Sequence, residues 1–187
     1  MSEFVARPTS LDGLLLIDSP VFIDDRGFFA ETWQQQKFER IGILESFVQD
    51  NQSGSSRGVI RGLHYQIKQP QGKLVRVASG EIYDVVVDLR RQSPSFGKWE
   101  GMRLSASDRT QLWIPPGFAH GFCVISEWAD VIYKVTDYYA PEFERTLLWN
   151  DPLLGIDWPL STIGEPVISQ KDRVGAPFAK AEYFDLP

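Results

Sequence analysis

The sequence has very little cysteine and no long apolar segment. Cys123 is the only cysteine among 187 residues, so the chain cannot form an internal disulfide bond. Its apolar neighbours Phe122 and Val124 predict a buried, unreactive thiol. No apolar run approaches the ~20 residues that a membrane-spanning helix needs. No basic segment precedes a signal-like stretch near Leu14–Ile17, so we expect a cytoplasmic location and no membrane partner.

Motifs that define several large enzyme classes are also missing. No Gly-x-Gly-x-x-Gly follows a predicted strand, so a typical dinucleotide site is not indicated. There is no Walker-type phosphate loop, no Gly-x-Ser-x-Gly elbow and no Cys/His cluster with zinc spacing. We therefore expect no cofactor, and any chemistry would use side chains alone.

Acidic residues outnumber basic ones, and the formal net charge is −6. This balance argues against nucleic acid as the main partner. Residues 51–80 nevertheless contain no Asp or Glu, and they include one of the two histidines, His64. A titratable base among fixed cations suits proton chemistry on an anionic substrate, and the alternative is a solvated basic loop beside a core histidine. The basic residues of this segment are Arg57, Arg61, Lys68, Lys73 and Arg76.

Short strands separated by turns dominate the rest of the pattern. The predicted strands are Leu14–Ile17, Phe28–Trp33, Ser46–Gln49, Val59–Tyr65, Lys73–Ala78, Ile82–Leu89, Trp99–Leu104, Gln111–Ile114, Gly121–Ile125, Val131–Asp137 and Thr146–Trp149. One helix is predicted at Gln34–Ile41, and the Ser- and Gly-rich segment Asn51–Gly58 is interpreted as a flexible loop. This pattern predicts a single all-β domain over residues 1–187, a sandwich or barrel with an irregular tail from about 151.

Alternation within two of these strands indicates which side chains face inward. Strand 82–89 has one fully apolar face and one mixed face. In residues 131–139 the same period places Tyr133, Val135 and Tyr139 on one face. If that face lines a barrel, two phenols enter one cavity. The alternative is that both tyrosines are amphipathic core residues with hydroxyl groups at the rim.

Several longer motifs occur in order, and together they resemble one family. These motifs are Asp25–Phe29, Phe47–Asn51, Arg61–Gln66, Gln71–Arg76, Gly80–Val85, Trp113–Phe122, Tyr133–Tyr139 and Leu148–Asp151. Over about Leu14 to Asp172 the chain resembles the dTDP-4-dehydrorhamnose 3,5-epimerases. The resemblance implies a cupin-type jelly roll, a homodimer with exchanged strands, and a role in dTDP-rhamnose biosynthesis.

Many cupins bind a metal through His-x-His, a glutamate and a later histidine, and this chain departs from that pattern. The first motif reads His64-Tyr65-Gln66, so its second ligand is missing, while His120 retains the later position. Two histidines are too few for a typical site. Together with the metal-independent branch that the family represents, this predicts no bound metal.

The resemblance also implies a chemical mechanism and the residues that perform it. In dTDP-4-dehydro-6-deoxy-D-glucose the C3 and C5 hydrogens lie alpha to the C4 ketone. Inverting either carbon needs deprotonation, a stabilised enolate and reprotonation from the opposite face. By resemblance, His64 is the base, Asp172 its carboxylate partner, Lys73 the cation beside the enolate oxygen and Tyr133 the acid. Without the resemblance, Asp172 would be interpreted as a surface turn residue and Lys73 as a solvated lysine.

Residues that bind the substrate are implied in the same way. Tyr139 matches the residue that stacks on the thymine base. His120 can equally be interpreted as a turn histidine. Whether Arg26 and Glu31 serve their own subunit's site or the partner's stays open. The other positions that match substrate contacts are Gln49, Asn51, Arg61, Glu144 and Lys171.

One local conflict leads to a structural prediction. In a regular strand Arg61 and His64 face opposite sides, whereas the resemblance places both in one site. Gly62 lies between them, and a glycine inside a strand often marks a bulge. We predict irregular backbone near Gly62. A regular ladder over 59–65, with Arg61 pointing away from the cavity, would contradict this site.

Two other functions stay open from the sequence. One is a related enzyme that epimerises a single carbon, or isomerises the keto group, of another dTDP-sugar. The other is a non-catalytic sugar-binding cupin. The retained His64, Lys73, Tyr133 and Asp172 weigh against the second, because a binding module needs no base and acid pair.

Overall fold

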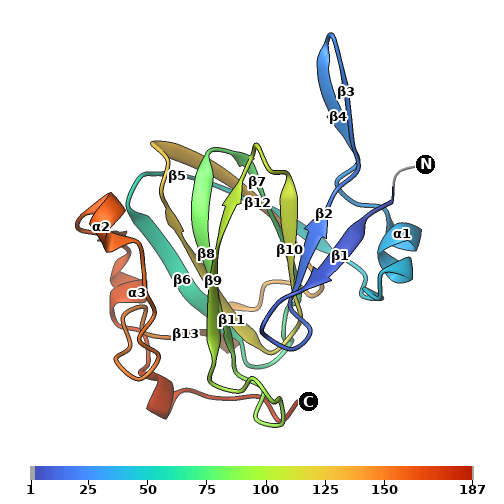
Figure 1. Cartoon of the computed structure of the whole chain (residues 1–187). Helices are drawn as coiled ribbons and strands as arrows, with labels where there is room; N and C mark the ends of the chain where they lie inside the picture. Colours follow the sequence, from blue (N-terminus) through green and yellow to red (C-terminus); the bar gives the residue numbers. More distant parts are fainter. Residues whose placement is uncertain (1–2, 187) are drawn as a thin grey trace.

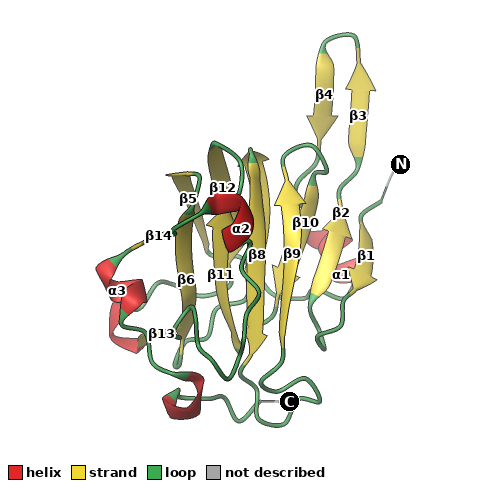
Figure 2. Ribbon diagram, turned by 60° about the vertical axis from the view of Figure 1, so that its left-hand side comes forward, coloured by secondary structure: helices red, strands yellow, loops and turns green. Residues whose placement is uncertain are grey.

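A computed structural model describes residues 3–186, and two β-sheets face each other across its interior (Figures 1 and 2). The predicted all-β class is confirmed. In chain order, the strands of sheet 1 are β1 (Val5–Pro8), β2 (Leu15–Asp18), β5 (Gln49–Ser56), β7 (Lys73–Ser79), β10 (Thr110–Ile114) and β12 (Trp128–Val135). They lie in the order β1-β2-β10-β7-β12-β5.

Sheet 2 forms the opposite wall. Its strands are β6 (Val59–Gln66), β8 (Glu81–Asp88), β9 (Trp99–Ser105), β11 (Phe118–Val124), β13 (Glu144–Thr146) and β14 (Val167–Ile168). They lie in the order β13-β6-β11-β8-β9, and β14 pairs with β6 in parallel. A separate antiparallel hairpin consists of β3 (Val21–Asp24) and β4 (Gly27–Ala30).

The helical segments are all short. They are α1 (Gln35–Arg40), α2 (Leu160–Ile163), α3 (Gln170–Arg173) and the 3₁₀ turns η1 (Pro141–Phe143) and η2 (Phe178–Lys180). The predicted helix therefore corresponds to α1, where the Gln34 side chain caps the first turn by accepting a bond from the Lys37 amide. Along residues 3–186, no helix is long and apolar enough to cross a membrane.

Strand β8 shows how the core is divided. Its mixed face contributes Ile82 and Val86 to the cluster between the sheets. Its fully apolar face contributes Val85 and Val87 to a second cluster, which the C-terminal segment covers with residues such as Trp158. Both faces of the strand are therefore buried, and the predicted irregular tail serves as the outer layer over sheet 2 (Figure 2).

The interpretation of Asn51–Gly58 as a flexible loop is wrong. Most of it belongs to β5, which pairs with β12 along its whole length. Asn, Ser and Gly have low strand propensity, but pairing with a neighbouring strand overrides such local preferences. The strand predicted at Ser46–Gln49 is correspondingly misplaced, because only Gln49 belongs to a strand.

Other boundaries also differ at the N-terminal side and after β12. Strands β1 and β3 were not predicted, and the strand expected over Phe28–Trp33 ends at Ala30. The last predicted strand, Thr146–Trp149, overlaps β13 only at Thr146. The β3–β4 hairpin projects away from the two sheets, which explains why its sequence lacks the burial alternation of a core strand (Figure 1).

Candidate functional site

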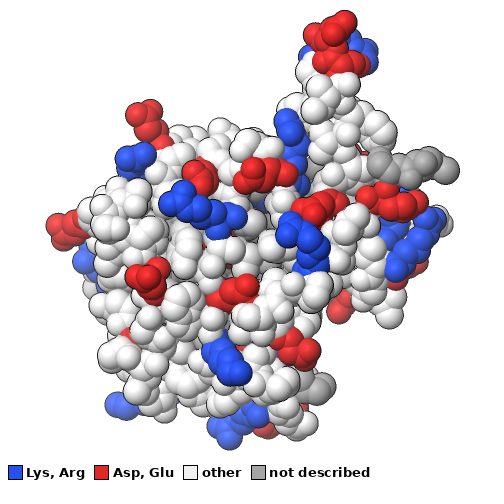
Figure 3. Space-filling view, viewed as in Figure 1, with Lys and Arg blue, Asp and Glu red and all other residues white. Residues whose placement is uncertain are grey.

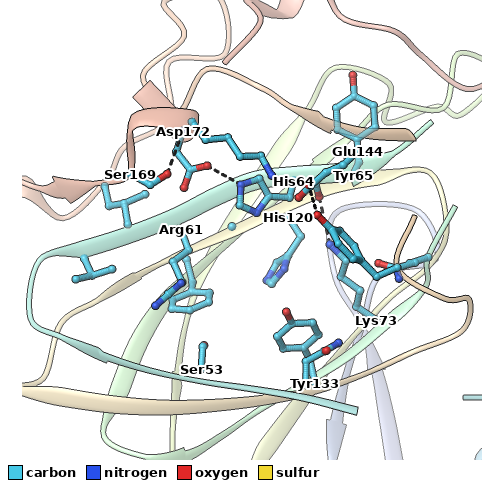
Figure 4. A pocket seen from close by; sticks show the side chains of 18 of the residues that line it. Ser53, Arg61, His64, Tyr65, Lys73, His120, Tyr133, Glu144, Ser169 and Asp172 are labelled. Carbon is cyan, nitrogen blue, oxygen red and sulfur yellow. Dashed lines mark hydrogen bonds and ion pairs between the residues drawn. The ribbon is translucent and has the colours of Figure 1, made fainter. Parts of the chain in front are cut away.

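A cavity of about 630 Å³ opens between the two sheets (Figure 4). It is lined by all the predicted site residues except Arg26 and Glu31. The predicted residues that line it are Gln49, Asn51, Arg61, His64, Lys73, His120, Tyr133, Tyr139, Glu144, Lys171 and Asp172. Residues that are up to 123 positions apart in the sequence, Gln49 and Asp172, thus meet in one place.

Arg26 and Glu31 lie elsewhere in the single chain. Arg26 is at the tip of the β3–β4 hairpin and pairs with Asp24 at 2.5 Å. Glu31 follows the hairpin and pairs with Lys37 at 2.5 Å. Neither residue lines the cavity of its own chain.

His64 and Asp172 form a close pair at the wall of the cavity. The Nε2 atom of His64 is 2.6 Å from Oδ1 of Asp172, and the carboxylate is buried. The backbone N–H of Gly62 donates to Oδ2 of Asp172 at 3.3 Å. Burial alone would raise the pKa of Asp172, but the bonds from His64, Gly62 and Ser169 together lower it. The interpretation of Asp172 as a surface turn residue is therefore wrong.

The backbone at Gly62 is irregular, as predicted. His64 pairs with His120, whereas Arg61 pairs with Phe122, so β6 carries one extra residue relative to β11. Such a bulge turns Arg61 toward the same cavity as His64 although three positions separate them. Gly62 has a φ of +117°, and a Cβ atom there would lie 2.5 Å from the Cα atom of Gly121. Only glycine fits this position.

His120 lies directly opposite His64 and belongs to a second His–Asp pair. Its Nε2 atom is 2.9 Å from Oδ2 of Asp84, and both side chains are buried. His120 is part of β11, so its interpretation as a turn histidine is wrong. Asp84 lies on β8 and was not among the predicted site residues.

Lys73 begins β7 and is buried, not solvated. Its Nζ atom donates to the backbone oxygen of His64 at 3.2 Å. Burial lowers the pKa of Lys73 to about 8, against the opposing effect of the carboxylates of Asp84 and Glu144. At neutral pH this lysine is protonated and places a positive charge in the cavity, but its pKa lies only slightly above neutral.

Tyr133 and Tyr139 both line the cavity, as the alternation suggested, but only Tyr133 lies in β12. Burial raises the pKa of Tyr133 although the nearby Arg61 charge opposes the shift, so the phenol keeps its proton at neutral pH. Figure 4 shows Tyr133 across the cavity from His64. The two side chains come from opposite sheets, so an imidazole and a phenol approach the cavity from opposite walls.

The mouth of the cavity carries a polar cluster. The hydroxyl of Tyr139 donates to Oε2 of Glu144 at 2.8 Å, and Nζ of Lys171 is 2.5 Å from the same oxygen. Burial raises the pKa of Glu144, but the bonds from Lys171 and Tyr139 lower it overall. Half of the Tyr139 surface is exposed, which suits an aromatic platform for a ligand.

Sequence reasoning missed other polar residues that line the cavity. Ser53 and Gln71 are examples, and Ser53 follows Gln49 and Asn51 at strand spacing on β5. That period-two signal was available, but the Ser- and Gly-rich composition concealed it. Asp84 could have been found as one of the two carboxylates, with Asp88, on the mixed face of the mainly hydrophobic strand 82–89.

The described part of the chain contains no group of three or more His, Cys, Asp and Glu side chains that could hold a metal ion. Each histidine instead pairs with one aspartate. The arrangement provides a base, a cation, a phenol and a cavity, which together can move protons at carbon.

Residues 8–180 match the family model described as dTDP-4-dehydrorhamnose 3,5-epimerase. The chain belongs to this family. It is therefore an isomerase, and the resemblance inferred from its motifs is confirmed. The jelly-roll fold of the family is also confirmed, because solved structures of family members superpose on nearly the whole chain.

Three relatives illustrate the match. The dTDP-4-dehydrorhamnose 3,5-epimerase of Pseudomonas aeruginosa is 57% identical over 96% of this chain and 98% of its own length. The crystal structure of dTDP-6-deoxy-D-glucose-3,5-epimerase from Legionella pneumophila with dTDP-4-keto-L-rhamnose has a TM-score of 0.92 and 46% identity, covering 96% of this chain and 95% of that one. A 3'-monoepimerase from Streptomyces bikiniensis, in complex with dTDP, has a TM-score of 0.86 and 31% identity, covering 93% and 87%. Identity is thus higher to these double epimerases than to the single-carbon enzyme.

Proposed function

We propose that this family member inverts C3 and C5 of dTDP-4-dehydro-6-deoxy-D-glucose and forms dTDP-4-dehydro-L-rhamnose in dTDP-rhamnose biosynthesis. The observation that carries the proposal is the placement of His64 with Asp172 on one wall of the cavity and Tyr133 on the other. Inversion at carbon requires this opposition of base and acid.

In this mechanism His64 removes the proton from the carbon next to the ketone. The resulting imidazolium forms an ion pair with Asp172, whose carboxylate lies 2.6 Å away. Because imidazole is a weak base for a carbon acid, the enolate oxygen needs electrostatic stabilisation. The Lys73 ammonium supplies it, and burial of this charge makes the interaction stronger than in water.

Tyr133 then donates its phenolic proton to the opposite face of the ring. The guanidinium of Arg61 acts to lower the pKa of Tyr133, so it stabilises the phenolate that remains after the transfer. The same positive charge favours an anionic nucleotide sugar in an otherwise acidic protein. Tyr139 offers its exposed ring to the thymine base, and the other lining residues bind the sugar and the diphosphate.

Solvent exchange tests the proposal directly. The protein is incubated with the substrate in D2O with EDTA, and C3 and C5 are followed by NMR. We expect deuterium at both carbons, and none after His64→Asn. Deuterium at a single carbon would favour a monoepimerase. Binding without exchange would favour a non-catalytic sugar-binding protein.

We also infer that the active form is a homodimer in which the β3–β4 hairpin of each chain contacts the other. The hairpin exposes four large apolar side chains, Phe22, Ile23, Phe28 and Phe29. Figure 3 shows uncharged atoms along this arm below a charged tip. An apolar arm that extends from a single chain is typical of a surface that another chain covers.

The dimer also explains the position of Arg26 and Glu31. Both lie on or beside the arm and outside the cavity of their own chain, so an exchanged arm can bring them to the partner's cavity. Light scattering of the wild type and of Ile23→Asp tests this assignment. We expect a dimer and a monomer, respectively, whereas a monomeric wild type would contradict it.

The cytoplasmic location is part of the proposal, and cell fractionation tests it.

A further inference from the structure

Asp84 is a buried carboxylate with an unusual hydrogen-bond environment. The residue is fully buried on β8, and its Oδ2 atom lies 2.9 Å from Nε2 of His120. Its Oδ1 atom is buried and has no hydrogen-bond partner within residues 3–186. A buried charge that is only half satisfied is costly, so its retention calls for an explanation.

Lys73 is a buried charge with free donor capacity nearby. An ammonium group has three donors, and within residues 3–186 Lys73 donates one hydrogen bond, to the backbone oxygen of His64. The carboxylate of Asp84 is the strongest opposite charge acting on this lysine. Two incompletely satisfied charges of opposite sign therefore come from facing sheets.

The surroundings of Lys73 can be stated element by element. The charges that act on its pKa are the carboxylates of Asp84 on β8 and Glu144 on β13. The other ionisable side chains that line the same cavity are Arg61, His64, Tyr65, His120, Tyr133, Tyr139, Lys171 and Asp172. Strand β10, which also pairs with β7, places Leu112, Trp113 and Ile114 beside it and adds no charge. Asp84 is therefore the anion of this group that does not line the cavity and is not paired with Lys171.

We propose that Asp84 is a positioning residue that acts through its two neighbours, keeping Lys73 in its ammonium form and fixing the orientation of the His120 ring. This inference rests on the proposed function. The carboxylate accepts the Nε2 proton of His120, which leaves Nδ1 as the ring nitrogen for another partner. It also opposes the loss of the proton from Lys73, so the cation is present when the enolate forms.

The test is the pH profile of kcat/KM for the wild type and for Asp84→Asn. In the wild type, we expect activity to decline at alkaline pH as Lys73 loses its proton. Removing a nearby opposite charge shifts a pKa by about 1–3 units, so in Asp84→Asn we expect the alkaline limb to move down by about one unit or more. Calorimetric binding of dTDP should remain within about threefold, because Asp84 does not line the cavity.

Lys73→Arg provides the decisive second background. Arginine stays charged at all accessible pH values, so this variant loses the limb that Lys73 produces. Adding Asp84→Asn to Lys73→Arg should then leave the alkaline part of the pH profile as it is in Lys73→Arg alone. A limb that moves equally in both backgrounds would overturn the proposal.

Asp88→Asn is the matched control, since Asp88 is also fully buried on β8 but bonds to Arg90, Ser93 and Ser95. We expect it to lower the melting temperature without moving the limb. If Asp84→Asn behaves in the same way, Asp84 is purely structural and the proposal is wrong. If Asp84→Asn does not fold, the profiles of the wild type and Lys73→Arg still decide whether Lys73 produces the limb, and its absence would overturn the proposal. Wild-type turnover tests the proposed function separately.

Discussion

The Nε2 atom of His64 and the Oδ1 atom of Asp172 lie 2.6 Å apart, although 108 positions separate the residues in the chain. The contact depends on two local features. Ser169 caps α3 by accepting a bond from the Asp172 amide, and the backbone N–H of Gly62, at the β6 bulge, donates to Oδ2 of Asp172. The pair therefore joins a wall strand to the C-terminal outer layer.

This pair leads to the first prediction. His64→Asn should reduce kcat by about 10²–10⁴-fold and abolish deuterium exchange at both carbons, because the base is lost. Asp172→Asn should reduce kcat less, since imidazole remains but its anionic partner does not. The matched control is Asp151→Asn, which removes a buried carboxylate that binds the backbone amides of Leu153 and Phe178. It should lower stability and leave kcat of the folded enzyme unchanged, and an equal loss in both Asp variants would contradict the assignment.

Tyr133→Phe should separate deprotonation from inversion. His64 can still remove the proton, but the opposite face has no donor. The imidazolium then returns a proton to the original face after exchanging with solvent. We expect recovered substrate to contain deuterium while product formation falls by about 10²-fold or more, as measured by NMR. Tyr83→Phe, on the outer face of β8, is the control. Parallel loss of exchange and product in Tyr133→Phe would argue against its role as the acid.

Lys73→Met should make the protein more stable and inactive. The pKa of Lys73 is about 8 in the fold against 10.5 ordinarily, so the buried ammonium costs about 3 kcal/mol at pH 7. Between pH 8 and pH 10.5 the Lys73 side chain is protonated to a greater extent in the unfolded chain than in the folded one. The free energy of unfolding of the wild type therefore rises with pH across this window. Urea unfolding at pH 7 and pH 10 measures both effects. The difference between variant and wild type should shrink at pH 10, and a constant difference would refute the explanation.

Cys123 should resist alkylation in the folded protein. Burial raises the pKa of its thiol to about 12 from 9.0, which reduces the thiolate fraction at pH 8 by about three orders of magnitude. Intact-mass analysis after iodoacetamide treatment should show no modification until urea unfolds the chain. Rapid labelling under native conditions would mean that the sheet around β11 opens readily.

Mixing two impaired variants tests the exchanged arm. Arg26→Ala should weaken the partner's site, and His64→Ala should inactivate its own site. In a mixed dimer one site receives both native residues, so random exchange of subunits should restore about a quarter of the wild-type activity. If the arm serves its own chain, every site lacks one residue and mixing restores nothing.

Much of the barrel could be predicted from the sequence, because strands such as β7, β8 and β10 carry continuous apolar or alternating patterns. Strand β5 could not, since its inward residues Gln49, Asn51 and Ser53 face a polar cavity instead of a core. Hydrophobic alternation is absent from a strand whose inward residues all face a polar cavity. Sequence-based assignment is therefore weakest for a strand such as β5, whose cavity-facing residues are all polar and whose composition is rich in Ser, Asn and Gly.

The residues that line the cavity could be named because local motifs, such as the segment around His64, carry the resemblance to the family. Without that resemblance, Asp172 and Lys73 would be interpreted as surface residues. The Asp84–His120 pair could not be predicted in the same way, because it depends on the register between β8 and β11. The location of Arg26 could not be predicted either. Its neighbours specify a turn, but nothing in the local sequence indicates that the hairpin leaves the body of the fold.

The close contact between Gly62 and Gly121 has a consequence for how the site can evolve. The two imidazoles lie on strands whose separation is limited by backbone touching backbone, since a Cβ at Gly62 would meet the Cα of Gly121 at 2.5 Å. Side-chain packing does not set this spacing. Core residues on either side of sheet 2 can therefore drift through many substitutions, or be redesigned for heat resistance, while the relative placement of the two histidines is preserved. Substitutions in the surrounding core therefore leave the distance between the two histidine-bearing strands unchanged.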